Sequence, residues 1–168
     1  MDKMPETSGR AGAREAILAA FRDIVLQNGY DRVRVLDIVQ RSGIARSTFY
    51  EHFQSREDLL LYATRRPLQL LAQLAGPKPD TEKAALVLAH FVENREFALS
   101  IMDGHSAGAL RRLLAEMIAH EEQFPASLPD AVAGAQLAVI TSWLERNDGR
   151  SAQQVAAMLR DVTARLIR

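Results

Sequence analysis

The chain has 168 residues, of which 48% are hydrophobic and 6% aromatic, and its formal net charge is zero. No run of about 18 apolar residues occurs, which argues against a membrane-spanning helix, and the first twelve residues lack the apolar stretch of a secretory signal. The absence of cysteine excludes disulfide and thiolate chemistry and fits a reducing cytoplasm, where we expect the protein to reside. Because the net charge is zero, any nucleic-acid footprint must be a local patch.

Apolar residues recur at helical spacing through most of the chain, which predicts an all-α protein. The first twelve residues are polar and contain Pro, Ser and Gly, so we expect residues 1–12 to form a disordered arm. Arg10 and Arg14 could reach DNA from this end of the chain, although a tail without a role is an equal alternative. The first helix is predicted over residues 13–28, with an apolar stripe of Ile17, Phe21, Ile24 and Val25.

The most informative stretch runs from residue 33 to residue 60. Apolar residues one helical turn apart define a first short helix, and Gly43 supplies the usual left-handed stop. A second short helix is predicted over residues 46–52, with Phe49 and Phe53 on its inner face. Ser55 has the chemistry to cap the helix that follows. A helix, a short turn containing glycine and a second helix are the elements of a helix-turn-helix.

The outer face of the second short helix carries hydrogen-bond donors of the kind that meet phosphates and base edges. In this frame the stretch resembles the DNA-binding segment of the TetR (tetracycline-repressor-like) transcriptional regulators. That pattern is roughly Ile-Ala, Ala-Gly-Val, Ser-x-x-Thr-x-Tyr-x-His-Phe and x-x-Lys-x-x-Leu. The matching residues here are Ile38-Val39, Ser42-Gly43-Ile44, Thr48, Tyr50, His52-Phe53, Arg56 and Leu59-Leu60.

The resemblance implies a set of DNA-contacting residues, which is Arg34, Arg46, Ser47, Thr48, Tyr50, His52 and Arg56. Those at the N-terminal end of the second helix would meet base edges, whereas Tyr50, His52 and Arg56 would hold phosphates. Two positions depart from the family pattern, because Arg34 and Ala45 stand where Ser or Thr usually caps the short helices. A lost cap costs roughly 1 kcal/mol, and Arg34 could compensate by meeting a phosphate. Taken one by one, these residues could also be an ordinary solvated face.

Residues 61–168 are predicted to form further helices. The helix that Ser55 caps should continue to about residue 75, broken or kinked at Pro67, and a Gly- and Pro-rich linker follows over residues 75–80. Thr81 is expected to cap the next helix, which has Leu86, Leu88, Phe91 and Val92 mostly inward. Later helices are predicted over residues 96–102, 107–123, 130–146 and 152–167, with Ser106 and Ser151 as caps.

The last two predicted helices have small residues and apolar stripes, and they resemble the C-terminal hairpin through which TetR-like proteins dimerise. The resemblance implies a homodimer whose interface includes Ala135, Val139, Trp143, Val155, Met158, Leu159, Val162 and Leu166. The alternative is that this hairpin only closes the core of its own chain. A dimer would give a helix-turn-helix reader two half-sites about one helical turn or more apart.

The resemblance also implies a small-molecule pocket in the second half, which is short for the family. Apolar residues with a few polar groups are the usual composition of such pockets, and the candidates are His90, Phe91, Phe97, Met102, His105, Phe124 and Trp143. Plain core packing is the alternative for each. No convincing catalytic or metal-binding set is present. Residues 104–108, GHSAG, lack the preceding strand that a nucleophile elbow requires.

We therefore expect residues 13–60 to be a DNA-binding domain and residues 61–168 a helical regulatory and dimerisation domain. The predicted function is a homodimeric repressor that binds a palindromic operator in double-stranded DNA and is released by a small apolar effector, without a cofactor. The alternative is a helical dimeric interaction protein that has lost specific DNA binding. The unusual cap positions and the zero net charge favour that alternative, and an enzyme is a distant third.

Overall fold

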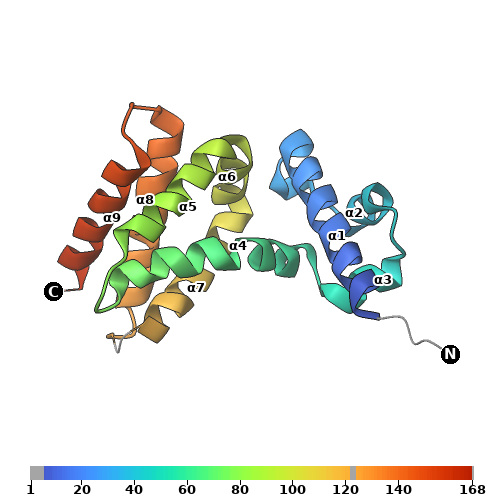
Figure 1. Cartoon of the computed structure of the whole chain (residues 1–168), viewed down its shortest axis with the longest axis horizontal. Helices are drawn as coiled ribbons and strands as arrows, with labels where there is room; N and C mark the ends of the chain where they lie inside the picture. The colour runs from blue at the N-terminus through green and yellow to red at the C-terminus, as the bar shows by residue number, and fades with distance from the viewer. Residues whose placement is uncertain (1–5, 122–123, 168) are drawn as a thin grey trace. The chain divides into compact units, whose positions relative to one another are not determined.

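The computed structural model describes residues 6–121 and 124–167, and the regular structure within these ranges is entirely helical (Figure 1). The predicted all-α fold class is therefore confirmed. The chain divides into two compact units, residues 1–63 and residues 64–168. The sequence placed this boundary slightly earlier, after residue 60.

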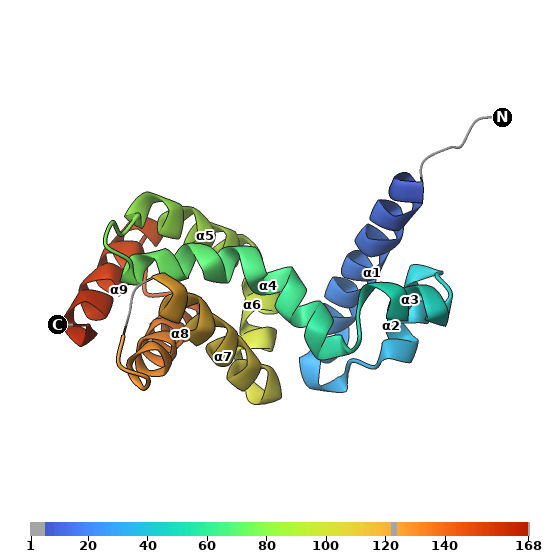
Figure 2. The ribbon, with the colours of Figure 1, turned by 90° about the horizontal axis from the view of Figure 1, so that it is seen from below.

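The first unit is a small helical domain around one apolar core. Its elements are α1 (Glu6–Asn28), the 3-10 turn η1 (Tyr30–Arg32), α2 (Val35–Ser42), α3 (Arg46–His52) and the start of α4 (Arg56–Ala72). α1 packs against η1, α2 and α3, and Figure 2 shows the two short helices beside it. Every one of these elements contributes to the core, whose buried side chains include Ile17, Phe21, Ile24, Val25, Tyr30, Ile38, Phe49, Leu59 and Leu60.

The first helix is longer than the sequence pattern predicted. α1 begins at Glu6, so the expectation of a disordered arm is wrong for residues 6–12. Each glycine in a helix costs about 1 kcal/mol relative to alanine, and two of them do not end a helix whose later turns are held by buried residues such as Ile17. Residues 1–5 lie outside the described residues.

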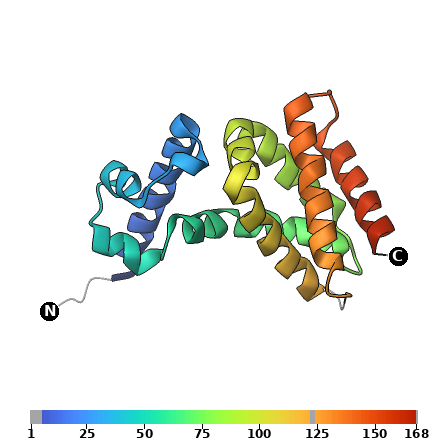
Figure 3. The ribbon, with the colours of Figure 1, turned by 180° about the vertical axis from the view of Figure 1, so that it is seen from behind.

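The second unit is a bundle that begins within α4. Its later elements are η2 (Gln73–Ala75), α5 (Thr81–Glu93), α6 (Arg95–Met102), α7 (Gly104–Glu121), α8 (Leu128–Arg146) and α9 (Ala152–Leu166). α8 packs against α7 on one side and α9 on the other, as Figure 3 shows, and α9 also packs against α5. Fully buried residues such as Leu88, Leu114, Ile140 and Leu159 form the core of the bundle.

α4 is continuous through Pro67, so of the predicted break or kink the break is wrong, and the kink stays a prediction. A proline removes one backbone hydrogen bond, but the turns around it remain anchored. Leu68, Leu71 and Ala72 are at most 2% exposed and hold this part of the helix on the bundle.

Several helix ends differ from their predicted positions. Asp80, rather than Thr81, caps α5, because its Oδ1 accepts a hydrogen bond from the Lys83 N–H at 3.0 Å. That backbone N–H also holds the pKa of the Asp80 carboxyl below its usual range. Ser106 lies inside α7 instead of capping it, and its hydroxyl donates to the Asp103 carbonyl. The Ser151 cap of α9 is confirmed: its hydroxyl accepts from the Gln154 N–H, and the Ser151 N–H donates to the Gln154 side-chain oxygen.

Two residues of α5 point outward against expectation. Leu86 is 72% exposed and Val92 is 49% exposed, while Leu88 and Phe91 are buried as predicted. The apolar pattern of this helix is broader than the face that the bundle covers, and periodicity alone does not locate the edge of that face.

Candidate nucleic-acid interface and ligand pocket

The turn between α2 and α3 depends on Gly43. This residue adopts φ 69° and ψ 15°, in the left-handed region, and its N–H donates to the Val39 carbonyl at 3.1 Å. A residue with a Cβ is strained in this conformation. Gly43 therefore ends α2 as predicted and directs the chain into α3.

α3 is held by its inner face. It spans Arg46–His52 as predicted, and Ala45 precedes it without a side-chain cap. Phe49 is fully buried and Phe53 is 2% exposed, with their ring centroids 6.0 Å apart. Because these rings fix one side of the helix, the other side faces outward. The residues on that side are exposed or half-buried, and they are Arg46, Ser47, Thr48, Tyr50, Glu51 and His52.

Arg46 and Tyr50 form a stacked pair on the outer face of α3. The Arg46 guanidinium lies 5.6 Å from the centroid of the Tyr50 ring, and the Tyr50 ring meets Phe49 edge-on at 5.4 Å. Tyr50 is 45% exposed. Cation–π contacts restrict a long side chain at modest energy, so Arg46 is partly oriented before any ligand arrives.

Arg34 is engaged by a neighbour. Its Nε and one terminal nitrogen donate to the two carboxylate oxygens of Asp37 at 3.0 and 2.8 Å. This hydrogen bonding holds the pKa of the Asp37 carboxyl below its usual range. The Arg34 side chain is nevertheless highly exposed. A phosphate that used these same two nitrogens would have to displace Asp37.

His52 presents less to solvent than the sequence implied. Its Nε2 is buried, and no hydrogen-bond partner for that atom lies in the part of the chain that the structure describes. The ring lies 6.3 Å from the Phe53 ring. A phosphate contact from His52 would have to use Nδ1.

Arg56 is tied to the backbone of its own domain. One terminal nitrogen donates to the carbonyls of Asp31 at 2.9 Å and Val33 at 2.7 Å, and more weakly to that of Tyr30 at 3.3 Å. The sequence reading of Arg56 as a phosphate ligand missed this arrangement, because these carbonyls lie more than twenty positions earlier in the chain. We therefore leave Arg56 out of the proposed DNA contacts.

The residues expected at a dimer interface fall into two groups. Val155 and Leu159 are fully buried and Trp143 is 7% exposed, all within the second unit's own core. Val155 and Leu159 face the bundle because α9 packs against α5 as well as α8. The others are half-buried or exposed at the surface, and they are Ala135, Val139, Met158, Val162 and Leu166.

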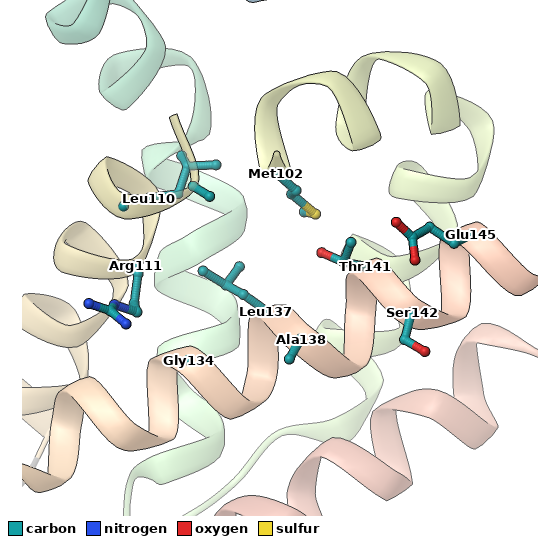
Figure 4. A pocket seen from close by; sticks show the side chains of 11 residues that line it. Met102, Leu110, Arg111, Gly134, Leu137, Ala138, Thr141, Ser142 and Glu145 are labelled. Atoms are coloured by element: carbon teal, nitrogen blue, oxygen red, sulfur yellow. The ribbon is translucent and has the colours of Figure 1, made fainter. Parts of the chain in front are cut away.

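A groove opens on the second unit between α6, α7 and α8. Its volume is about 510 Å³, and Met102, Leu137 and Thr141 point toward the same space (Figure 4). The remaining lining residues are Ala107, Gly108, Leu110, Arg111, Gly134, Ala138, Ser142 and Glu145. The small residues leave the space open, while hydroxyl and charged groups stand around an apolar floor.

Of the residues predicted to form a ligand pocket, Met102 lines this groove. Phe91 and Trp143 are core residues, whereas His90 and His105 are exposed and Phe97 and Phe124 are half-buried. Trp143 lines a separate hollow of about 260 Å³ beside Val139 and Met158. The residues predicted to form a ligand pocket therefore do not line one common cavity. The sequence prediction missed the small residues Ala107, Gly108, Gly134 and Ala138, which line the groove from α7 and α8.

Two further features of the described residues bear on the chemistry of the chain. Among the described residues, no group of three or more His, Asp or Glu side chains is arranged to hold a metal ion. No helix within the same ranges is long and apolar enough to cross a membrane. The GHSAG segment lies at the start of α7, and its Ser106 is 1% exposed, which does not suit a nucleophile.

Comparison with known proteins gives the same picture for the first unit. Residues 17–63 match the family model described as bacterial regulatory proteins, tetR family. The HTH-type dhaKLM operon transcriptional activator DhaS of Lactococcus lactis subsp. lactis (strain IL1403) is 43% identical over 88 residues, which are 50% of this chain and 46% of that protein. The uncharacterized HTH-type transcriptional regulator YxbF of Bacillus subtilis (strain 168) is 40% identical over 90 residues, covering 48% and 24%. The chain thus spans about half or less of the length of these curated relatives.

Solved structures resemble the chain along most of its length. A TetR transcriptional regulator from Streptococcus agalactiae 2603V has a TM-score of 0.64 at 19% identity, covering 94% of this chain and 97% of that one. The structure of the dihydroxyacetone kinase operon activator DhaS has a TM-score of 0.54 at 22% identity, covering 92% and 96%. At these identities the likeness concerns the fold.

A glycine-stopped α2, an α3 with a buried aromatic face and an outer face of donors define a helix-turn-helix protein. The family match covers this domain and the structural likeness extends through the helical bundle. Over residues 17–63, the first unit carries the helix-turn-helix segment of the tetR family of bacterial regulatory proteins.

Proposed function

We propose that the chain is a homodimeric transcriptional repressor in the cytoplasm, which binds a palindromic operator through α3 and is released by a small effector. The observation that carries the proposal is the outer face of α3. Its donors project from a helix whose inner face is locked by Phe49 and Phe53. A short helix whose buried face is held by the domain core and whose exposed face is polar suits insertion into a major groove.

The roles of the α3 residues follow from their positions. Arg46, Ser47 and Thr48 occupy its N-terminal turn, the part of a recognition helix that meets base edges. Tyr50 and the Nδ1 side of His52 would meet phosphates. Arg34 would join them by exchanging Asp37 for a phosphate oxygen, because its guanidinium lies at the exposed start of α2.

The second copy would dock on the outer face of α8 and α9. Five apolar side chains remain partly exposed there, and they are Ala135, Val139, Met158, Val162 and Leu166. Burial of such a surface against a partner is favourable. The hollow beside Val139 and Met158 could accommodate a side chain of the second copy. Dimerisation would double the number of phosphate contacts and impose a half-site spacing.

The groove between α6, α7 and α8 is our candidate for the effector. Its volume of about 510 Å³ falls in the range of small-molecule sites. Met102, Leu110 and Leu137 supply apolar surface, while Thr141 offers a hydroxyl. An effector that binds one arrangement of the dimer more tightly than the other would shift the balance between DNA-bound and free protein.

Salt-dependent binding of the wild type and Arg46→Ala to duplex DNA tests the DNA-binding part of this proposal. The logarithm of the binding constant should fall steeply with the logarithm of salt concentration. If Arg46 reads a base, Arg46→Ala should cost about 1–3 kcal/mol and relax sequence preference. Arg32→Ala, which removes an exposed arginine of η1 outside α3, is the matched control. A flat salt response in the wild type would contradict DNA binding.

One observation favours the alternative of a protein-interaction module. Asp37 occupies the guanidinium of Arg34 and cancels its charge at the start of α2. If the helix-turn-helix has become structural, the wild type should ignore duplex DNA even at low salt. The relatives and structural neighbours include an activator and a repressor, so a reporter assay must decide whether this chain activates or represses.

A further inference from the structure

Arg56 is arranged to hold the chain segment that leads into the helix-turn-helix. One of its two terminal nitrogens donates to the carbonyls of Tyr30, Asp31 and Val33 at 3.3, 2.9 and 2.7 Å. These carbonyls belong to η1 and to the residue just before Arg34, which precedes the first turn of α2. Because the Arg56 guanidinium binds three carbonyls, it fixes the backbone that leads into α2. This helix has no side-chain cap of its own.

The same guanidinium lies over an aromatic ring. Its centre is 5.0 Å from the centroid of Tyr30, a residue that is 4% exposed. Burial raises the pKa of the Tyr30 hydroxyl, and the nearby Arg56 charge opposes that rise. The Tyr30 ring in turn meets Phe21 of α1 edge-on at 6.2 Å. Arg56 thus joins the start of α4 to η1 and, through Tyr30, to α1.

The place of Arg56 on α4 is not explained by the stability of α4. A positive charge in the first turn of a helix opposes the helix dipole. The turn itself is secured by other groups, because the Asp58 N–H donates to the Ser55 hydroxyl at 3.0 Å and the Gln54 N–H donates to the Asp58 carboxylate at 2.9 Å. Arg56 therefore extends from a capped first turn of α4 toward the carbonyls of Tyr30, Asp31 and Val33, which interact favourably with its positive charge.

We propose that Arg56 is a positioning residue for DNA binding, which sets the orientation of α2 and α3 from inside the domain and does not contact phosphate. This inference rests on the proposed DNA-binding function. An arginine suits the role because its flat face covers the tyrosine ring while one edge donates to carbonyls, whereas lysine is a point charge on a flexible stem. Loss of Arg56 leaves the outer face of α3 chemically unchanged but loosens its support.

The test compares the full-length wild type with Arg56→Met, Arg56→Lys and Arg32→Met. Binding to one duplex is measured across a salt series at a temperature at which each protein is fully folded, together with thermal midpoints and amide exchange. We expect Arg56→Met and Arg56→Lys to bind about tenfold more weakly at every salt concentration, with the wild-type slope. The Asp37 and Ile38 N–H groups, which donate to the Arg34 carbonyl, should exchange faster. Arg32→Met should resemble the wild type.

Each other outcome has a definite meaning. A slope that becomes shallower by about 0.9 for each lost contact would make Arg56 a phosphate ligand and overturn the proposal. A lower thermal midpoint with unchanged affinity would reduce its role to fold stability and would also overturn it, as would full affinity in Arg56→Lys. If Arg56→Met does not fold, Arg56→Lys decides between these results. A wild type that ignores DNA at low salt contradicts the proposed function itself.

Discussion

Arg34 and Asp37 form an exposed ion pair at the start of the helix-turn-helix, and the pair affects what the domain can offer to DNA. Each partner satisfies the other through two hydrogen bonds of 3.0 and 2.8 Å. Exposed pairs contribute little to stability, because water and salt screen their attraction. The more important consequence is electrostatic, because Asp37 adds a negative charge beside the region where phosphates are expected.

Asp37→Asn should therefore increase DNA affinity. Removing the carboxylate frees Arg34 for a phosphate, and one additional contact should steepen the salt slope by about 0.9 per protomer. Fluorescence anisotropy of a labelled duplex over a salt series measures both effects. Asp161→Asn is the matched control, since Asp161 also pairs with an arginine at 2.7 Å but lies on α9. Equal changes in the two variants would show that net charge, and not Arg34, is responsible.

At the scale of the elements, the conformation of Gly43 is what lets α2 and α3 follow each other so closely. Its φ of 69° is outside the range that residues with a Cβ prefer. Open space surrounds the position where a Cβ would lie, so any cost of a substitution there is conformational and not steric.

Gly43→Ala should lower the free energy of unfolding by roughly 1 kcal/mol, because alanine pays for the left-handed conformation. Gly12→Ala is the matched control, since Gly12 lies within α1, has no positive φ and also faces open space. There the same substitution should stabilise the protein by up to about 1 kcal/mol. Urea denaturation of both variants measures the difference. A stabilising Gly43→Ala would contradict the assigned turn.

The elements also show what periodicity can and cannot predict. The sequence predicted the bounds of α3, Arg46 to His52, correctly. Gly43 marks the end of the preceding helix, and the spacing of Phe49 and Phe53 marks the inner face of α3. The family resemblance assigned Val155 and Leu159 to a dimer interface, although both are fully buried within their own chain, where α9 packs against α5 and α8. A stripe identifies the apolar face of a helix but not the partner of that face. The three carbonyls beneath Arg56 leave no trace in local sequence at all.

For the whole molecule, the proposed mode of DNA binding requires a dimer of two identical chains. The outer face of α8 carries Ala135, Ala138 and Ser142 one helical turn or so apart, a surface of small side chains that allows another helix to approach closely. Ala138 is exposed and lines both the groove toward α7 and the hollow toward α9.

Ala138→Glu should convert the dimer into a folded monomer. In a symmetric interface each copy brings its own carboxylate near that of the other copy, and like charges brought together cost several kcal/mol. Sedimentation velocity measures the change, and circular dichroism checks that the helices remain. Leu86→Glu is the control, because Leu86 is 72% exposed on α5 and lies outside this face. A variant with Ala138→Glu that stays dimeric would exclude the outer face of α8 from the interface.

The central claim is that two α3 helices read two half-sites of one DNA molecule. The most direct measurement is to present the purified protein with a random duplex library, sequence what it retains, and repeat this with an Arg46→Ala, Tyr50→Ala variant. We expect enrichment of a palindromic site whose half-sites are separated by about one helical turn or more, and loss of that enrichment in the variant. No enrichment at low salt, or the same enrichment in both proteins, would contradict this claim.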